Sequence, residues 1–308
     1  MPLDRPHFLC IGAQKAATTW LAHNLRQHPE VWMPPQKELH YFDAFERVPD
    51  PHRYTRWYQY PNGGAPSWRP DLLRRTPDGG RARNALRKGI KEGEIRWALR
   101  YVFGARTDRG YEALFPRRAG LVTGEATPGY AVLSEPHIAS LVRRLPAVRL
   151  LYLLRDPVER AWSAARMRAE KRDVPPIEDW PSDAQIAFLR ERIPMGLRHS
   201  DYAAVLDRWE RHVPPDRLLV GFYDDVVAEP EAVLRSVYRF LGVGDDASHV
   251  PEDARQPRNA RAVGRTAPPE AGRWLTERLL NAIERAHARF DNAHTANWLA
   301  AATRRLAS

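Results

Sequence analysis

The segment GAQKAATT, from Gly12 to Thr19, combines residue types that bind a phosphate group. An apolar run over Phe8–Gly12 predicts a buried strand before it, and apolar residues at helical spacing predict a helix that begins at Thr18. A phosphate between them would contact the N–H groups of the first helical turn, the ammonium group of Lys15 and the threonine hydroxyls. The segment is not the G-x-x-x-x-G-K-S/T loop of nucleotide triphosphate sites, because Lys15 stands three residues after the glycine and a second glycine is missing. The alternative is a plain turn with a capping threonine.

A second segment, KELHYFD, begins at Lys37 and ends at Asp43. Glu38 and His40 alternate in it, so on an extended segment both side chains would face the same side. Either the carboxylate or the imidazole could accept a proton from an attacking hydroxyl or amine. The alternative is a salt bridge at a sheet edge between Lys37 and a carboxylate, with His40 half buried.

A third segment, RDPVERAWS, begins at Arg155 and follows a strand predicted over 148–154. Arg155 would lie at the carboxyl end of that strand, where open α/β sheets bind ligands. Its guanidinium can pair with a phosphate through two hydrogen bonds, and Ser163, two helical turns further on, offers a hydroxyl. The alternative is an ordinary helix start with Asp156 as the cap and Arg160 in a surface ion pair.

Strands that alternate with helices must position these three segments. A buried strand is predicted over 218–223, an amphipathic helix over 230–241 that ends at Gly242, and a late helix over 275–290. This alternation predicts an α/β fold with a central, mostly parallel sheet flanked by helices on both faces.

The chain is expected to form a single domain over 1–308 with one long insertion. The insertion spans about 47–118, is rich in Pro, Gly, Arg and aromatic residues, and contains one helix-like stretch near 84–103. Because it follows the first two segments, it is predicted to face the substrate.

Charge and cysteine content limit the partners and the compartment. The net charge of +10 favours anionic partners, but the basic residues are spread along the chain, so nucleic-acid binding is not predicted. The single cysteine, Cys10, excludes an internal disulfide framework and fits a reducing compartment. The apolar stretch over 8–13 is too short for a signal sequence or a membrane span, so we expect a cytoplasmic protein without a transmembrane segment.

The three segments in this order resemble the sulfotransferases that use 3′-phosphoadenosine-5′-phosphosulfate (PAPS). The resemblance is to the heparan-sulfate-type branch, glucosaminyl 3-O- and N-sulfotransferase-like, and its bacterial relatives. The 5′-phosphosulfate loop of the family matches 12–19, its 3′-phosphate motif matches 155–163, and the Lys-Glu-x-His-aromatic-Phe-Asp segment of the 3-O type matches 37–43. With further similar stretches, such as 124–130, the resemblance covers roughly 7–265 and implies a P-loop-type fold.

The resemblance also implies roles for individual residues. Glu38 would be the general base, with His40 as the alternative, and Lys15 would reach the transferring sulfuryl group. The acceptor oxygen or nitrogen would displace adenosine 3′,5′-bisphosphate in line, without a metal. The residues assigned to the donor are Gln14, Lys15, Ala16, Ala17, Thr18, Thr19, Arg155, Ser163, Arg258 and Arg261. Those assigned to the acceptor are Lys37, Asp43 and Tyr130.

The sequence departs from the family at one position of the cleft and leaves two other functions open. Ala126 stands where the heparan-type pattern has a lysine, which favours a small glycan, a glycolipid or a natural product as acceptor. A P-loop kinase would share the fold but should show a standard phosphate loop and a strand-end Asp for magnesium. A non-catalytic relative that binds a nucleotide or RNA is the other alternative.

Overall fold

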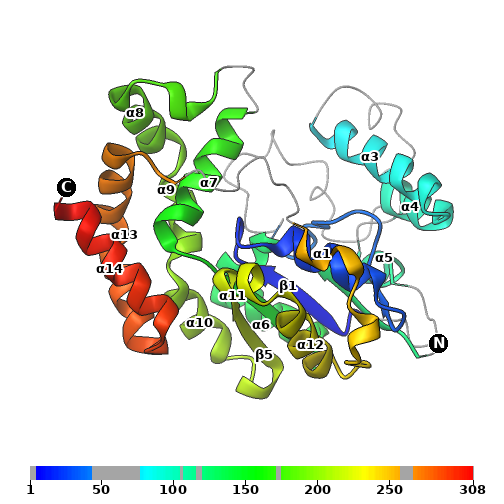
Figure 1. The fold of residues 1–308 in the computed structure, drawn as a ribbon. Helices are drawn as coiled ribbons and strands as arrows, with labels where there is room; N and C mark the ends of the chain where they lie inside the picture. The colour runs from blue at the N-terminus through cyan, green and yellow to red at the C-terminus, as the bar shows by residue number, and fades with distance from the viewer. Residues whose placement is uncertain are drawn as a thin grey trace.

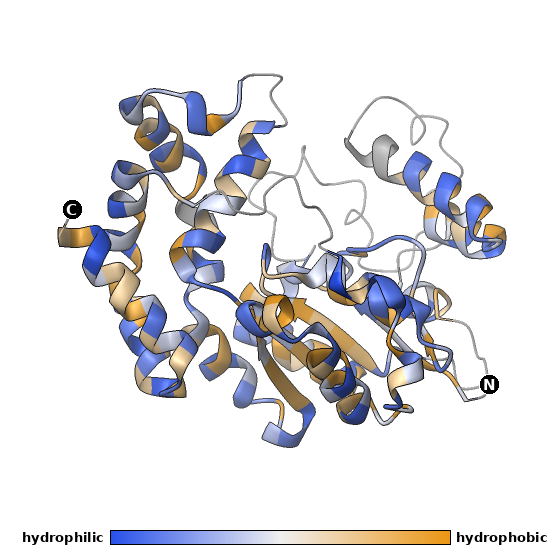
Figure 2. Ribbon diagram, in the orientation of Figure 1, coloured by the Kyte–Doolittle hydropathy of each residue, from blue (hydrophilic) through white to orange (hydrophobic). Residues whose placement is uncertain are grey.

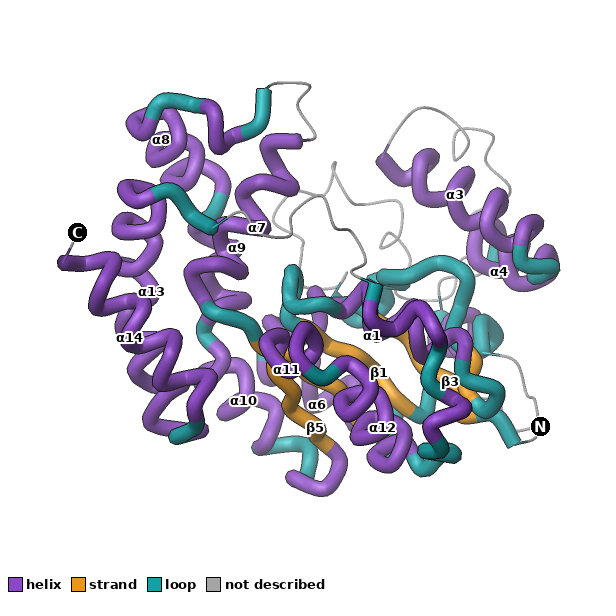
Figure 3. Tube along the Cα trace, in the orientation of Figure 1, coloured by secondary structure: helices purple, strands orange, loops and turns teal. Residues whose placement is uncertain are grey.

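A central sheet of five parallel strands organises the chain, in the order β2-β3-β1-β4-β5 (Figures 1 and 3). The computed structural model describes residues 5–43, 77–104, 107–115, 120–170, 175–256 and 266–307. The strands are β1 Phe8–Gly12, β2 Val31–Trp32, β3 Val122–Ala126, β4 Arg149–Leu154 and β5 Leu218–Phe222. The predicted α/β fold with a parallel sheet is confirmed.

The two strands at the middle of the sheet carry continuous apolar runs. β1 is buried throughout, and β4 is buried from its second residue, because helices cover both of their faces. Gly124 of β3 allows the Phe8 ring to lie across the neighbouring strand, since a Cβ there would meet the ring at 2.4 Å. The expectation of a buried strand at 218–223 is wrong about burial, because β5 forms an edge of the sheet and all five of its residues are only half-buried.

Helices cover both faces of the sheet. In Figure 1, α1, α11 and α12 lie in front of it, and α6 and α10 lie behind. α13 and α14 pack against each other at one end of the molecule, beside α7 and α8. The bounds are α1 Thr18–Gln27, α6 Glu135–Arg144, α7 Pro157–Ala169, α8 Ser182–Arg192, α9 Pro194–Leu197, α10 Tyr202–Glu210, α11 Tyr223–Ala228, α12 Pro230–Leu241, α13 Pro269–Phe290 and α14 Ala293–Ala307.

Several local predictions are confirmed at the residue level. α1 begins at Thr18, α7 has Pro157 in its first turn, and α12 ends at Gly242, whose φ of +75° forms the C-cap. These signals are local, because a proline or glycine at a helix end acts through its own backbone conformation.

The predicted insertion contains helices where it is described. α3 (Pro77–Lys91), α4 (Ile95–Phe103) and α5 (Asp108–Glu112) lie within it, and its part over 47–76 lies outside the described residues. One continuous helix near 84–103 is a wrong prediction, because Gly93 adopts a φ of +71° and turns the chain between α3 and α4. In the part of the chain that the structure describes, every helix is too short or too polar to cross a membrane.

Candidate active site

The loop between β1 and α1 presents an open helix N-terminus. Lys15 and Ala17 adopt φ values of +74° and +64°, and Ala17 occupies the N-cap position. Among the described residues no side chain caps α1, so the alternative of a capping threonine is wrong. The N–H groups of the first turn therefore face outward without a side-chain acceptor, which is the arrangement that binds an anion.

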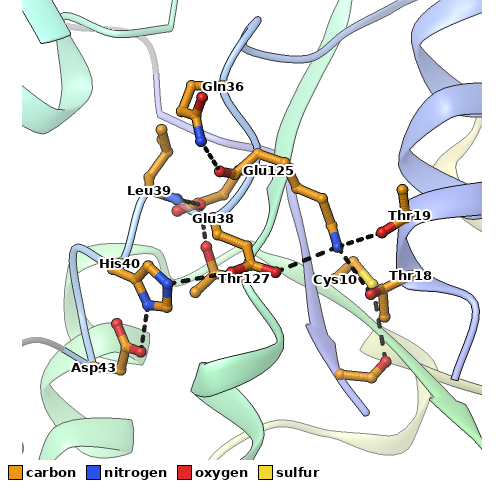
Figure 4. Close-up of polar contacts among 12 residues, drawn as sticks. Cys10, Thr18, Thr19, Gln36, Glu38, Leu39, His40, Asp43, Glu125 and Thr127 are labelled. Atoms are coloured by element: carbon orange, nitrogen blue, oxygen red, sulfur yellow. Dashed lines mark hydrogen bonds and ion pairs between the residues drawn. The ribbon is translucent and has the colours of Figure 1, made fainter. Parts of the chain in front are cut away.

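Lys37 joins the second segment to this loop (Figure 4). Its Nζ donates to Thr18 Oγ1 at 3.0 Å and to Thr19 Oγ1 at 3.1 Å, and it lies 3.5 Å from Glu38 Oε1. A hydroxyl that accepts from an ammonium group directs its own proton elsewhere, so both threonines remain able to donate to an anion at the start of α1. The ion pair between Lys37 and a carboxylate, which the alternative interpretation expected, is present. The same ammonium group also contacts two hydroxyls of the segment 12–19.

Glu38, His40 and Asp43 form a chain of contacts at one turn (Figure 4). His40 Nε2 lies 3.4 Å from Glu38 Oε2, and His40 Nδ1 lies 2.7 Å from Asp43 Oδ2. The segment is not extended as expected, because Glu38 and His40 have φ values of +64° and +54°. The two side chains nevertheless meet, and the Glu38 side chain is 38% exposed while that of Asp43 is 4% exposed. Glu38 is therefore the carboxylate that a bound acceptor could reach.

A buried carboxylate beneath this turn holds its backbone. Glu125 is fully buried at the end of β3, and its Oε2 accepts a hydrogen bond from the N–H of Leu39, between Glu38 and His40. Burial raises the pKa of the Glu125 carboxyl, and its hydrogen bonds oppose that shift. The donors are Tyr111 Oη at 2.6 Å, Thr127 Oγ1 at 2.7 Å, Tyr130 Oη at 2.9 Å and Leu39 N at 3.4 Å.

Two features of this buried cluster were not found from the sequence. Glu125 lies in a stretch that resembles the family, but its type and spacing alone do not show that four donors converge on it. Tyr130, expected at the acceptor, is fully buried, and its hydroxyl accepts from the N–H of Tyr41 at 3.0 Å. The structure thus places Tyr130 beneath the turn.

Arg155 brings the third segment to the first. Its Nη1 donates to the carbonyl of Lys15 at 3.2 Å, and its guanidinium lies 4.5 Å from the centroid of the Tyr223 ring. Tyr202 Oη donates to the Arg155 carbonyl at 2.6 Å and fixes the backbone at the end of β4. Burial lowers the pKa of the Lys15 ammonium group, and the Arg155 charge adds to this while Glu170 opposes it.

The helix after Arg155 is built differently from α1. Asp156 caps α7 by accepting from two of its first N–H groups, so this helix end has less room for an anion than α1. Ser163 is buried on α7. Arg160, which the alternative interpretation placed in a surface ion pair, is instead fully buried. It donates to Ser200 Oγ at 2.6 Å and to the Gln14 carbonyl at 3.4 Å, and burial lowers its pKa to about 10. Neither its burial nor its contact with the loop had a signal in the sequence.

Three further residues were expected to bind the sulfuryl donor, and the structure describes one of them. Ala16 is buried in the loop, where its N–H donates to the Ala13 carbonyl at 3.1 Å. Arg258 and Arg261 lie outside the described residues. Within the described ranges, no group of three His, Cys, Asp or Glu side chains is placed to hold a metal ion.

Curated relatives share part of the chain. Heparan sulfate glucosamine 3-O-sulfotransferase 3B1 of Mus musculus is 33% identical over 135 residues, which cover 43% of this chain and 34% of that protein. The Homo sapiens 3B1 protein is 29% identical over 175 residues, which cover 50% of this chain and 45% of that protein. The chain therefore spans less than half the length of each of these two relatives.

Solved structures share its fold. A sulfotransferase from Alicyclobacillus acidocaldarius matches with a TM-score of 0.61 and 23% identity, covering 96% of this chain and 99% of its own. The sulfotransferase domain of the olefin synthase from Synechococcus PCC 7002 has a TM-score of 0.50 and 16% identity, covering 94% and 95%. The model of the sulfotransferase family matches residues 6–247, a range that includes all three segments. As their resemblance predicted, the chain belongs to the sulfotransferase family.

Proposed function

We propose that the chain is an enzyme that transfers a sulfuryl group from PAPS to a hydroxyl or amine of a small glycan, glycolipid or natural product. The observation that carries the proposal is the hydrogen bond from Arg155 to the Lys15 carbonyl, which joins the first segment (12–19) to the third (155–163). A donor with phosphate groups at both ends of its nucleoside needs two cationic subsites. The ends of the neighbouring strands β1 and β4, which carry Lys15 and Arg155, would provide them.

The residues on the donor side fit such a nucleotide. The open N-terminus of α1, the hydroxyls of Thr18 and Thr19 and the ammonium group of Lys15 would hold the 5′-phosphosulfate. Arg155 would hold the 3′-phosphate, with Ser163 further along α7 as a second donor. When bound, PAPS supplies an activated sulfuryl group.

The residues on the acceptor side fit the removal of a proton. Glu38 would accept the proton of the attacking hydroxyl or amine, and His40 would orient Glu38 or replace it as base. The Asp43 carboxylate fixes the imidazole ring from its other nitrogen. Lys15 would stabilise the negative charge that develops on the leaving oxygen, because a cation aimed at that atom acts most strongly in the transition state.

We also propose that residues 1–308 form one domain whose insertion faces the acceptor. Asn84 of α3 donates through Nδ2 to Gln36 Oε1 at 2.8 Å, and Gln36 directly precedes Lys37. This contact supports an insertion that lies near the proposed base. The named mammalian relatives act on heparan sulfate glucosamine, which supports a carbohydrate-bearing acceptor. Ala126, in place of the family's lysine, removes one cation from the cleft and favours an acceptor less anionic than heparan sulfate.

Calorimetry with adenosine 3′,5′-bisphosphate and AMP tests the donor. The bisphosphate is expected to bind much more tightly, and Arg155→Ala is expected to reduce that preference by about 1.5–3 kcal/mol, the loss of one charged contact. Arg211→Ala, which removes an exposed arginine paired with Glu135, is the matched control and should change neither affinity. Equal affinity of the wild-type protein for both nucleotides would refute the donor, and transfer of label from PAPS to a glycan mixture tests the reaction itself.

A further inference from the structure

An apolar stripe lies exposed along one side of α4. Ile95, Leu99 and Phe103 are 51%, 46% and 42% exposed, and their spacing of four residues places them on one face of the helix. Of the five large hydrophobic side chains that are exposed in the described part of the chain, four lie on α3 and α4. The opposite face of α4 is buried and consists of Trp97, Ala98, Tyr101 and Val102.

The hairpin of α3 and α4 is strongly basic. Between positions 82 and 104 it carries six Lys and Arg residues against two Glu. Arg96 and Arg100 are exposed on the side of α4 that borders the stripe, and Arg87 and Lys91 are exposed on α3. Exposed apolar side chains bordered by arginine and lysine are the arrangement of helices that lie in the interface of an anionic bilayer.

We propose that the α3–α4 hairpin docks reversibly on the surface of an anionic lipid bilayer. The stripe would enter the interface, and the basic residues would lie among the lipid phosphates. Charge argues against a second copy of this chain as the occupant, since two hairpins face to face would oppose their cationic surfaces. A nucleic acid would leave the stripe in water. The hairpin lies at the end of the molecule opposite α13 and α14 (Figures 1 and 2).

Docking would bring the candidate site close to the bilayer. The hairpin is tied to the site by the Asn84–Gln36 hydrogen bond and by Trp32, whose Nε1 donates to Glu94 Oε1 at 3.3 Å. Gly89 packs α3 closely on α4, because a Cβ there would lie 2.5 Å from that of Ala98. If the proposed function holds, this arrangement favours an acceptor carried by a lipid. The docking itself does not depend on that function.

Vesicle sedimentation tests the docking. Wild-type protein is expected to sediment with vesicles of phosphatidylcholine and phosphatidylglycerol but not with phosphatidylcholine alone. The double substitution Leu99→Gln with Phe103→Gln should reduce the bound fraction at least about tenfold, because two inserted side chains are lost. Val227→Gln is the matched control, since Val227 is 67% exposed on α11, away from the hairpin. Because all three side chains are exposed, circular dichroism should show these variants to be folded.

A fluorescent label measures insertion at a single position. The sole cysteine, Cys10, is buried, and burial raises the pKa of its thiol to about 11, so a cysteine introduced by Leu99→Cys would be the reactive one. A polarity-sensitive label there should shift to the blue with anionic vesicles, whereas the same label after Val227→Cys should not.

Three results would overturn the proposal. The first is vesicle binding that is unchanged by the loss of the stripe, which would show attraction by net charge alone. The second is a label at position 99 whose emission does not shift. The third is a wild-type dimer in light scattering that the stripe substitutions convert to a monomer, which would make the stripe an interface between two copies.

Discussion

Replacement of Glu125 provides the most direct test of how the candidate base is positioned. Four donors converge on this carboxylate, and three of them are hydroxyls of buried side chains. Glu125→Ala leaves all four without that acceptor, and each buried unpaired donor costs about 1–3 kcal/mol. Since water can enter the polar space that is left, we expect a total loss of about 3–6 kcal/mol in the free energy of unfolding.

Glu125→Gln is expected to lose much less stability than Glu125→Ala, because the glutamine amide can still bond to most of the four donors. The amide oxygen can still accept from Leu39 N and Thr127, while the amide NH₂ would face Tyr111 and Tyr130. A tyrosine hydroxyl can turn and accept, but that of Tyr130 would then accept from both Tyr41 N and the amide, and its own proton would lose Glu125 as its acceptor. One poorly made hydrogen bond is therefore expected, with a loss of about 1–2 kcal/mol.

Urea denaturation at several pH values distinguishes the effect of Glu125 ionisation on the free energy of unfolding from the effect of its hydrogen bonds. Because the pKa of Glu125 is raised in the folded state, the protonated form is favoured on folding, so its contribution to stability is complete at acid pH and declines as pH rises through the raised pKa. Glu125→Gln lacks this titration, so the excess free energy of unfolding of the wild type over Glu125→Gln should shrink as pH rises above about 4.3, the ordinary pKa of a glutamate. A difference in free energy of unfolding that grows in favour of the wild type as pH rises would contradict a raised pKa of Glu125.

The kinetic readout distinguishes positioning from stability. If the Leu39 contact holds the turn that carries Glu38, Glu125→Gln should lower kcat about tenfold while KM and the affinity for adenosine 3′,5′-bisphosphate stay near wild type. The reasoning is refuted if Glu125→Ala loses less than about 1 kcal/mol of stability, or if Glu125→Gln loses stability but retains full kcat.

Four further substitutions probe the site and the hairpin. Lys15→Ala should lower turnover by about 10²-fold or more while calorimetry shows a smaller loss of nucleotide affinity. Glu38→Gln should lose roughly 10²–10⁴ in turnover at unchanged nucleotide affinity, and His40→Asn less. A wild-type rate that falls from about pH 8 to about pH 6 would assign the proton to His40 instead. Gly89→Ala should cost about 1–3 kcal/mol in urea denaturation, because the added Cβ would overlap Ala98.

Elements that depend on local signals were predictable from the sequence. β1 and β4 are short apolar runs, and the ends of α7 and α12 are set by Pro157 and Gly242. The break at Gly93 was missed because the apolar pattern continues through it, although its positive φ is a local signal of the same kind as that of Gly242. The half-exposure of β5 follows from its place at the sheet edge, and strand order is not a local property.

Within the candidate site, the sequence indicated which residues lie together but not their backbone conformations or their contacts. The three segments were each recognisable, and parallel strands bring the first and third together at one edge of the sheet. The backbone at Glu38 and His40 could not be predicted, because its left-handed conformation accompanies a hydrogen bond from Leu39 to a carboxylate 86 residues away. The contacts of Lys37 with the hydroxyls of Thr18 and Thr19 on α1 are equally non-local.

The ammonium group of Lys37 contacts both the proposed phosphate-binding segment and the proposed base. It donates to Thr18 and Thr19 of the segment 12–19, and it pairs with Glu38. Effects of substitutions at groups that share a partner do not add. A change at Thr19 and a change at Glu38 would each redistribute the same charge, so their measured effects on rate would overlap. Apportioning the rate between donor binding and proton removal in this chain therefore requires a thermodynamic cycle that includes Lys37.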